Sequence, residues 1–188
     1  MIEDPWRVVG VSVVGTSHLD KAVPCQDAHR YQVLSGGELL VAVADGAGSA
    51  ARAETGASRA VDKAIEKLAQ LLQAGTPPSD EASWKHLMTG VFGLVRAELD
   101  GMAELENRPI RDFATTLTVA VATGEWTAVG QLGDGAAVAR NAGGRLWLTV
   151  NPQRGEYANE AYFVTLANAL EYLEVCVWHE PVTALVLI

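Results

Sequence analysis

The sequence predicts an α+β protein that forms one domain over residues 1–188, with mainly antiparallel sheets. Its 188 residues are enough for a single core of two packed layers. Short apolar runs indicate strands in the first and last parts of the chain, and two long stretches with helical periodicity lie between them. Strands, two helices and strands again, in hairpin order, favour this class over an alternating βαβ fold.

The first third of the chain is predicted to be β structure. Residues 6–16 are rich in valine, and residues 29–45 read as a hairpin around Ser35-Gly36-Gly37. The apolar run of residues 39–44 ends abruptly at Asp45-Gly46, which is typical of a strand buried on both faces. We therefore expect this strand to place a carboxylate at its C-terminal end.

Two amphipathic helices and a second set of strands follow. Apolar residues recur at spacings of three and four over residues 50–74, where Gly75-Thr76-Pro77-Pro78 stops the pattern. A second helix is expected over residues 84–102, after the capping candidates Ser79 and Asp80. Further strands are expected at residues 115–122, 126–132, 136–140, 145–150, 175–178 and 183–188, with a polar, irregular stretch at 151–165.

The charge balance excludes several classes of partner. Fourteen Lys and Arg residues face 23 Asp and Glu residues, which gives a net charge of −9. Because there is no basic run, neither nucleic acid nor a membrane is expected to bind. Metal cations are the more natural ligands of such an acidic protein. The absence of a leader-like or membrane-spanning segment predicts a cytoplasmic location.

Carboxylates in loops are the candidates for chemistry. Asp45-Gly46 and Asp134-Gly135 each follow an apolar strand, and Asp27 precedes another. Mg²⁺ and Mn²⁺ prefer such oxygen ligands, and a pair of these ions can activate water and clamp phosphate oxygens. The simpler interpretation is a turn, since Asp-Gly is a common turn dipeptide; it remains open for Asp134-Gly135.

Five segments follow one another along the chain as a set of motifs. They are Gly15-Thr16-Ser17-His18 with Pro24-Cys25-Gln26-Asp27-Ala28, Val43-Ala44-Asp45-Gly46-Ala47-Gly48-Ser49, Phe113-Ala114-Thr115-Thr116-Leu117, Gly130-Gln131-Leu132-Gly133-Asp134-Gly135 and Gly155-Glu156-Tyr157-Ala158-Asn159-Glu160. In this order they resemble the motifs of the metal-dependent protein phosphatases of the protein phosphatase 2C type, especially a bacterial branch. The resemblance runs from about residue 11 to residue 188.

This resemblance implies an α-β-β-α sandwich, in which helices flank two mainly antiparallel sheets. It implies a protein-serine/threonine phosphatase with two Mn²⁺ or Mg²⁺ ions, which hydrolyses phosphoserine and phosphothreonine by a metal-bridged hydroxide. The expected partners are proteins phosphorylated on serine or threonine and a cognate bacterial Ser/Thr kinase.

The resemblance also assigns roles to individual residues. Asp45 and Asp27 are implied as catalytic residues and, together with Gly46 and Gln26, as metal ligands. The remaining implied roles are contact with the substrate phosphate, for Lys21 and His18, and support of the site, for Asp134, Thr115 and Ser49.

Departures from the family pattern motivate a second hypothesis. Gln26 is neutral where many members have a glutamate, and the arginine expected shortly before Asp27 is absent. A second Asp-Gly and a final aspartate, expected after the last strand, do not follow Ile188. We therefore expect a C-terminally incomplete domain, for which the alternative function is a non-catalytic pseudophosphatase or a phosphoprotein-binding assembly module.

Overall fold

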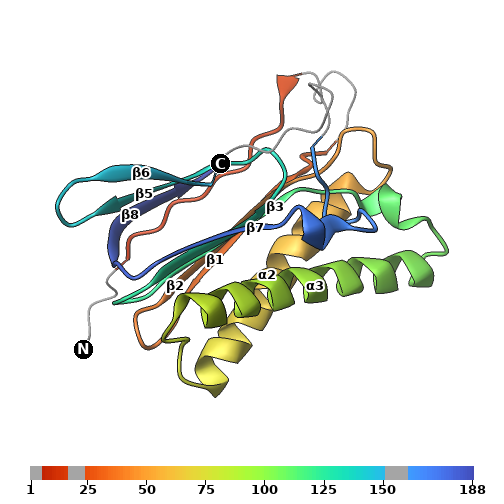
Figure 1. The fold of residues 1–188 in the computed structure, drawn as a ribbon. Helices are drawn as coiled ribbons and strands as arrows, with labels where there is room; N and C mark the ends of the chain where they lie inside the picture. The colour runs from red at the N-terminus through yellow and green to blue at the C-terminus, as the bar shows by residue number, and fades with distance from the viewer. Residues whose placement is uncertain (1–5, 17–23, 151–160) are drawn as a thin grey trace.

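The computed structural model of the chain describes residues 6–16, 24–150 and 161–188. Strands, two long helices and further strands follow one another along the chain, which confirms the α+β class (Figure 1). The elements are β1 (Asp27–Val33), β2 (Leu39–Asp45), α2 (Ala53–Ala74), α3 (Glu81–Leu105), the 3₁₀ helix η1 (Ile110–Phe113), β3 (Leu117–Ala122), β4 (Thr127–Leu132), β5 (Ala137–Asn141), β6 (Leu146–Val150), the 3₁₀ helix η2 (Ala169–Glu171), β7 (Glu174–Trp178) and β8 (Val182–Leu187).

The larger sheet has five strands in the order β1-β2-β3-β4-β7, and every neighbouring pair is antiparallel. Its central strands β3 and β4 are buried along their whole length. The β3 sequence LTVAVA explains this, since small and β-branched side chains suit a strand that is covered on both faces. The strand ends that carry the candidate carboxylates therefore belong to a sheet with a rigid, buried centre.

The hairpin of β1 and β2 keeps a regular register throughout. Two hydrogen bonds close its turn, from the Leu34 amide to the Glu38 carbonyl (2.9 Å) and from the Gly37 amide to the Leu34 carbonyl (2.9 Å). The ladder then runs without a bulge until Asp27 lies opposite Asp45 at its open end.

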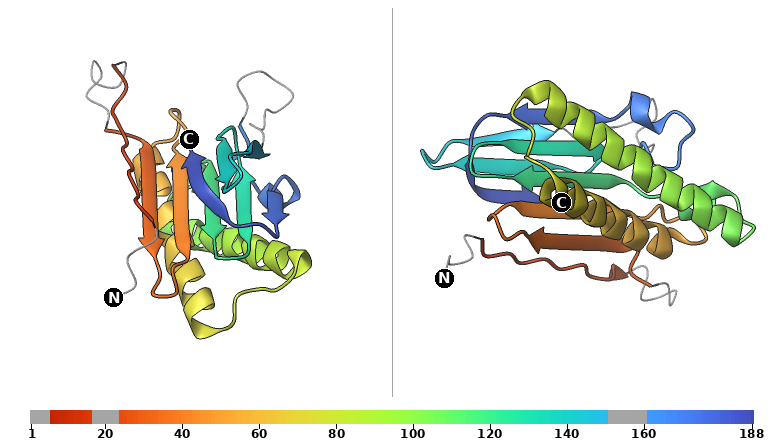
Figure 2. Two further views of the ribbon diagram at one scale, coloured as in Figure 1. Left: turned by 90° about the vertical axis from the view of Figure 1, so that its left-hand side faces the viewer. Right: turned by 90° about the horizontal axis from the view of Figure 1, so that it is seen from below.

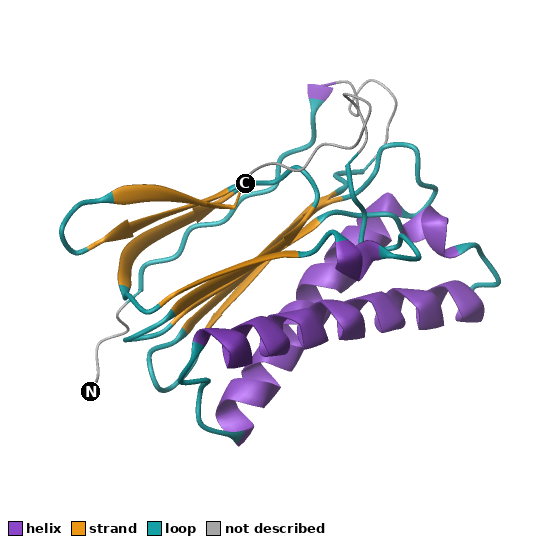
Figure 3. Ribbon diagram, in the orientation of Figure 1, coloured by secondary structure: helices purple, strands orange, loops and turns teal. Residues whose placement is uncertain are grey.

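The smaller sheet, in the order β6-β5-β8, packs on one face of the larger sheet (Figure 3). Leu39 and Ala122 from the larger sheet pack with Ala139 and Val182 from the smaller one. The helices α2 and α3 cover the opposite face of the larger sheet, so the layers follow the order helices, sheet, sheet (Figure 2). The principal core lies between the helices and the larger sheet, and its largest fully buried side chains include Trp84, Phe92 and Met88.

The expected sandwich of helices, two sheets and helices is confirmed for its two antiparallel sheets and for the helices on the larger sheet. The described residues contain no helix over the smaller sheet. Helix α2 begins at Ala53 rather than at residue 50, and the Asp80 carboxylate caps α3 by accepting the Ser83 amide hydrogen (2.9 Å). None of the helices seen here is both long enough and apolar enough to cross a membrane.

The strand predicted over residues 6–16 is wrong. This segment is extended and runs beside β1 without joining either sheet (Figure 2). Three of its valines face solvent, with exposed fractions of 94% for Val9, 77% for Val11 and 70% for Val13. Valine spacing reports β propensity, which depends on packing against neighbouring strands and cannot show whether such a neighbour exists.

An ion cluster joins the two helices. Glu98 of α3 accepts hydrogen bonds from Arg59 Nε (2.8 Å) and forms an ion pair with Lys63 Nζ (2.8 Å), both of α2. These contacts, that of Lys63 first, hold the pKa of the Glu98 carboxyl below its ordinary value, although partial burial opposes them. Because the pKa is lowered in the folded state, the contribution to stability is present at neutral pH and is lost as the pH falls through the lowered pKa.

We predict that Glu98→Gln lowers the melting temperature at pH 7 by roughly 2–4 °C. The difference from the original chain should shrink as the pH falls through the lowered pKa of Glu98, because protonation then makes Glu98 neutral as well. Thermal unfolding followed by circular dichroism from pH 3 to pH 7 measures this. Glu104→Gln, on an exposed part of the same helix, is the matched control and should show no such pH-dependent difference.

A pair of helical glycines gives a second prediction. A β-carbon on Gly56 of α2 would collide with the backbone carbonyl of Phe113, whereas one on Gly101 of α3 would meet nothing within 4 Å. Gly56→Ala should therefore lower the free energy of unfolding by about 1–3 kcal/mol. Gly101→Ala should raise it by up to about 1 kcal/mol. Urea denaturation measures both, and equal effects of the two substitutions would contradict the close helix packing.

Candidate active site

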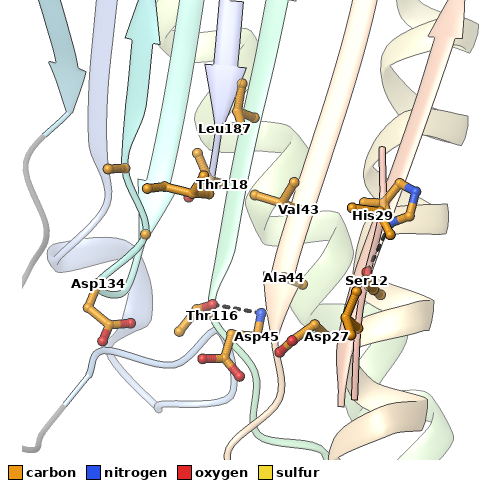
Figure 4. Close-up of a pocket in the computed structure, with 16 residues that line it drawn as sticks. Ser12, Asp27, His29, Val43, Ala44, Asp45, Thr116, Thr118, Asp134 and Leu187 are labelled. Carbon is orange, nitrogen blue, oxygen red and sulfur yellow. Dashed lines mark hydrogen bonds between the residues drawn. The ribbon is translucent and has the colours of Figure 1, made fainter. Parts of the chain in front are cut away.

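Three of the predicted carboxylates meet at one end of the sandwich. Asp27 begins β1, Asp45 ends β2, and Asp134 lies in the loop after β4, so the antiparallel order brings all three to the same end of the sheet. They line one cavity of about 540 Å³ together with the side chains of Thr116 and Thr118 (Figure 4). This is the size of a typical small-ligand site.

Asp27 and Asp45 are a close cross-strand pair. The Gly46 amide donates a hydrogen bond to the Gln26 carbonyl (3.0 Å), which makes Asp27–Asp45 a non-hydrogen-bonded pair of the ladder. In such a pair both side chains point to the same face, with β-carbons about 4.5–5.5 Å apart. The register thus offers a cation two charged oxygen donors side by side.

The space around Gly46 leaves no room for a side chain. A β-carbon there would lie 2.6 Å from the Ala53 carbonyl oxygen and 2.8 Å from the Gln26 carbonyl oxygen. Both contacts are with backbone atoms, which cannot move aside cheaply. The glycine therefore lets the first residue of α2 approach the end of β2, directly behind the Asp45 carboxylate.

Thr115 and Thr116, at the entry to β3, fix the main chain of Asp45. The Asp45 amide donates to Thr116 Oγ1 (3.0 Å), and the Asp45 carbonyl accepts from the Thr116 amide (2.9 Å) and from Thr115 Oγ1 (3.0 Å). Both threonines are buried. Thr115, which the resemblance implies as a supporting residue, makes one of these three bonds, and Thr116, to which the sequence assigned no separate role, makes two.

The Asp134 loop packs against the same threonine. Gly133 has φ of 115°, a left-handed conformation that favours glycine, and a β-carbon there would collide with the Thr116 side chain. Thr116 therefore contacts both carboxylate loops, one through its hydroxyl and one through its methyl group. The sequence pattern left a simple turn open for Asp134-Gly135, and the structure shows that Asp134 also faces the cavity (Figure 4).

Two other features of the site were not predicted. Ser12 and His29 line the cavity and form a hydrogen bond between Oγ and Nδ1 (2.9 Å). Gln131, a polar residue in the apolar strand β4, is fully buried and donates to the Gly133 and Gly135 carbonyls (3.1 and 2.9 Å). A long polar side chain flanked by apolar residues and glycine in a strand was the signal that could have identified Gln131.

The oxygen donors present fit a hard divalent cation. Asp27 and Asp45 supply two carboxylates, and the buried Gln26 Oε1, near Gly48, has no hydrogen-bond partner among the described residues. Mg²⁺ and Mn²⁺ accept carboxylate, amide and water oxygens. Within residues 6–16, 24–150 and 161–188, no three His, Cys, Asp or Glu side chains gather closely enough to hold a metal by themselves, so neutral oxygens would have to complete the coordination.

The remaining predicted residues are not brought to the cavity. Ser49 is exposed in the loop that follows Gly48, and Gln26 is buried and does not belong to the cavity lining. Lys21 and His18, implied for the substrate phosphate, lie outside the described residues.

The family model and the curated relative that match this chain both describe phosphatases. The family model of protein phosphatase 2C matches residues 14–188. Serine/threonine-protein phosphatase 3 of Escherichia coli (strain K12) is 36% identical over 173 residues, which cover 90% of this chain and 66% of that protein. The chain thus spans just under two thirds of the length of this relative.

Solved structures share the fold at low sequence identity. The serine/threonine phosphatase of S. agalactiae has a TM-score of 0.62 at 15% identity, over 92% of this chain and 73% of that one. Serine/threonine phosphatase Stp1 from Staphylococcus aureus has a TM-score of 0.57 at 12% identity, over 81% of this chain and 64% of that one.

The Thr116 contact to Asp45 gives a testable prediction. Thr116→Val keeps the methyl that packs on Gly133 but removes the acceptor of the Asp45 amide hydrogen, a loss worth about 1–3 kcal/mol for a buried group. Hydrogen exchange of the Asp45 amide, measured by NMR, should speed up about tenfold or more. Thr116→Ser keeps the hydroxyl and should stay near the original rate; equal rates in all three proteins would contradict this role.

Proposed function

The chain belongs to the protein phosphatase 2C family, and from this we propose that it hydrolyses phosphoserine and phosphothreonine in proteins with bound Mn²⁺ or Mg²⁺. The observation that carries the proposal is the facing pair of Asp27 and Asp45 at the rim of a cavity of about 540 Å³. A ladder that places two like charges opposite each other suits a site that binds a positive ion.

The charge of the chain supports the same proposal. A phosphorylated side chain is a dianion near neutral pH, and a protein of net charge −9 would repel it without a local positive charge. When bound, a divalent cation supplies that charge and also lowers the pKa of a water molecule that it coordinates. The proposed substrate therefore requires the cation that the two carboxylates would attract.

Each residue of the site has a proposed role. Asp27 and Asp45 hold the cation through their carboxylates, with the Gly46 carbonyl and the Gln26 amide oxygen as neutral donors. Thr115 and Thr116 keep the Asp45 backbone in place through their hydrogen bonds. Asp134, exposed on the opposite side of the cavity, supports the site there.

The proposal also covers contacts with the substrate and the source of that substrate. Lys21 and His18 are proposed to donate hydrogen bonds to the phosphate, and Ser49 to support the loop after Gly48. A Ser/Thr kinase of the same organism would supply the phosphorylated proteins. The relatives named serine/threonine phosphatases motivate this substrate class, and they do not favour the non-catalytic alternative over it.

We predict that the chain releases phosphate from a phosphothreonine peptide only when Mn²⁺ or Mg²⁺ is added. Asp45→Asn should lower the rate at least about 100-fold, because it removes a charged ligand and leaves a weaker neutral one. Phosphate release and Mn²⁺ binding by isothermal titration calorimetry measure the two effects.

Asp62→Asn is the matched control for this test. It removes the same charge from a half-buried residue whose ion pair is with Arg30, outside the lining of the cavity. We expect it to leave phosphate release and Mn²⁺ binding unchanged. Release without added metal, or release unaffected by Asp45→Asn, would overturn the proposal, whereas a folded chain that binds Mn²⁺ without turnover would point to the non-catalytic alternative.

A further inference from the structure

Gln131 is an unusual residue for the middle of a sheet. Its side chain is fully buried in β4, although the residues around it in the strand are apolar or glycine. Burial of an amide is unfavourable unless its hydrogen-bonding groups find partners. Its partners therefore indicate what this side chain does.

The side-chain amide of Gln131 makes three hydrogen bonds to residues that the structure describes. Nε2 donates to the Gly133 carbonyl (3.1 Å) and to the Gly135 carbonyl (2.9 Å), and Oε1 accepts from Thr118 Oγ1 (3.3 Å). Carbonyl oxygens can only accept, so the NH₂ group must face the loop and the oxygen must face Thr118. Thr118 is the register partner of Gln131 on β3 and is itself buried.

These bonds fix the backbone on both sides of Asp134. The two carbonyls that flank Asp134 are held by one NH₂ group, while Gly133 packs on the Thr116 side chain. Asp134 itself is exposed and faces the cavity that Asp27 and Asp45 also line (Figure 4). Gln131 does not line this cavity, so any effect on the site must act through the loop or through Thr118, which does line it.

We propose that Gln131 is a positioning residue, whose buried amide holds the Asp134 carboxylate over the carboxylate cavity, with Thr118 orienting the amide. The role at the site rests on the proposed function, because it concerns cation and phosphate binding in that cavity. The contact with the loop does not, and it can be measured separately.

The first test reads the loop itself. Gln131→Met keeps the length of the side chain but removes both donors, so hydrogen exchange of the amides of residues 133–135 should speed up about tenfold relative to the core amides of β3. Thr118→Val keeps the amide and removes only its orienting donor, and a smaller increase is expected. Thr118→Val also serves if Gln131→Met does not fold.

The second test reads the site, with Mn²⁺ as the probe. Gln131→Met should weaken Mn²⁺ binding about tenfold, as is common when a residue that supports a ligand is removed. Asp134→Asn should weaken it at least as much. If Gln131 acts only through Asp134, the double variant should bind no more weakly than Asp134→Asn alone.

Thr127→Val is the matched control. Thr127 is equally buried in β4, at the far end of the strand, where its hydroxyl donates to the Glu180 carbonyl (3.0 Å). It should lower stability without changing Mn²⁺ binding or exchange in the loop. The same effect from Thr127→Val, unchanged exchange in Gln131→Met, or additive losses in the double variant would each overturn the positioning role.

The two proposals fail in different ways. If the original chain neither binds Mn²⁺ nor releases phosphate, the proposed function fails, and the exchange measurement still decides whether Gln131 holds the loop. If the original chain binds Mn²⁺ and Gln131→Met binds it equally well, the function stands and the role of Gln131 at the site is wrong.

Discussion

The pairing of Asp27 with Asp45 is the constraint on which the rest of the site depends. A strand ladder has two kinds of pair, and this one belongs to the kind in which side chains approach most closely. The fold therefore brings two carboxylates side by side at the rim of the cavity. Hard cations are the ligands that carboxylates attract most strongly.

Neutral groups from the central strands restrain the loops that carry these charges. Threonine hydroxyls hold the main chain of Asp45, and a glutamine amide holds the backbone around Asp134. Because β3 and β4 are buried along their whole length, they are stiff supports. The larger sheet thus provides both the core of the protein and the frame of its cavity.

Local patterns predicted the elements better than their contacts. Helical periodicity located α2 to within three residues of its start, and the apolar run before Asp45 predicted β2. Asp27, Asp45 and Asp134 were identified because each stands at a strand end. The contributions of Thr116 and Gln131 were missed because their partners lie on other strands or in a later loop. The strand predicted over residues 6–16 was wrong for a related reason, since valine spacing cannot show whether a partner strand is present.

The turn that closes the β1–β2 hairpin sets the alignment of the two carboxylates at the other end of the ladder. It lies seven ladder pairs from Asp27, roughly 20 Å along the strands. A slip of one residue would rotate every β1 side chain to the opposite face, so Asp27 and Asp45 would no longer share a cavity. Exposed turns usually tolerate insertions and deletions during evolution. Here a change of length is compatible with the paired carboxylates only if the register of the two strands is kept.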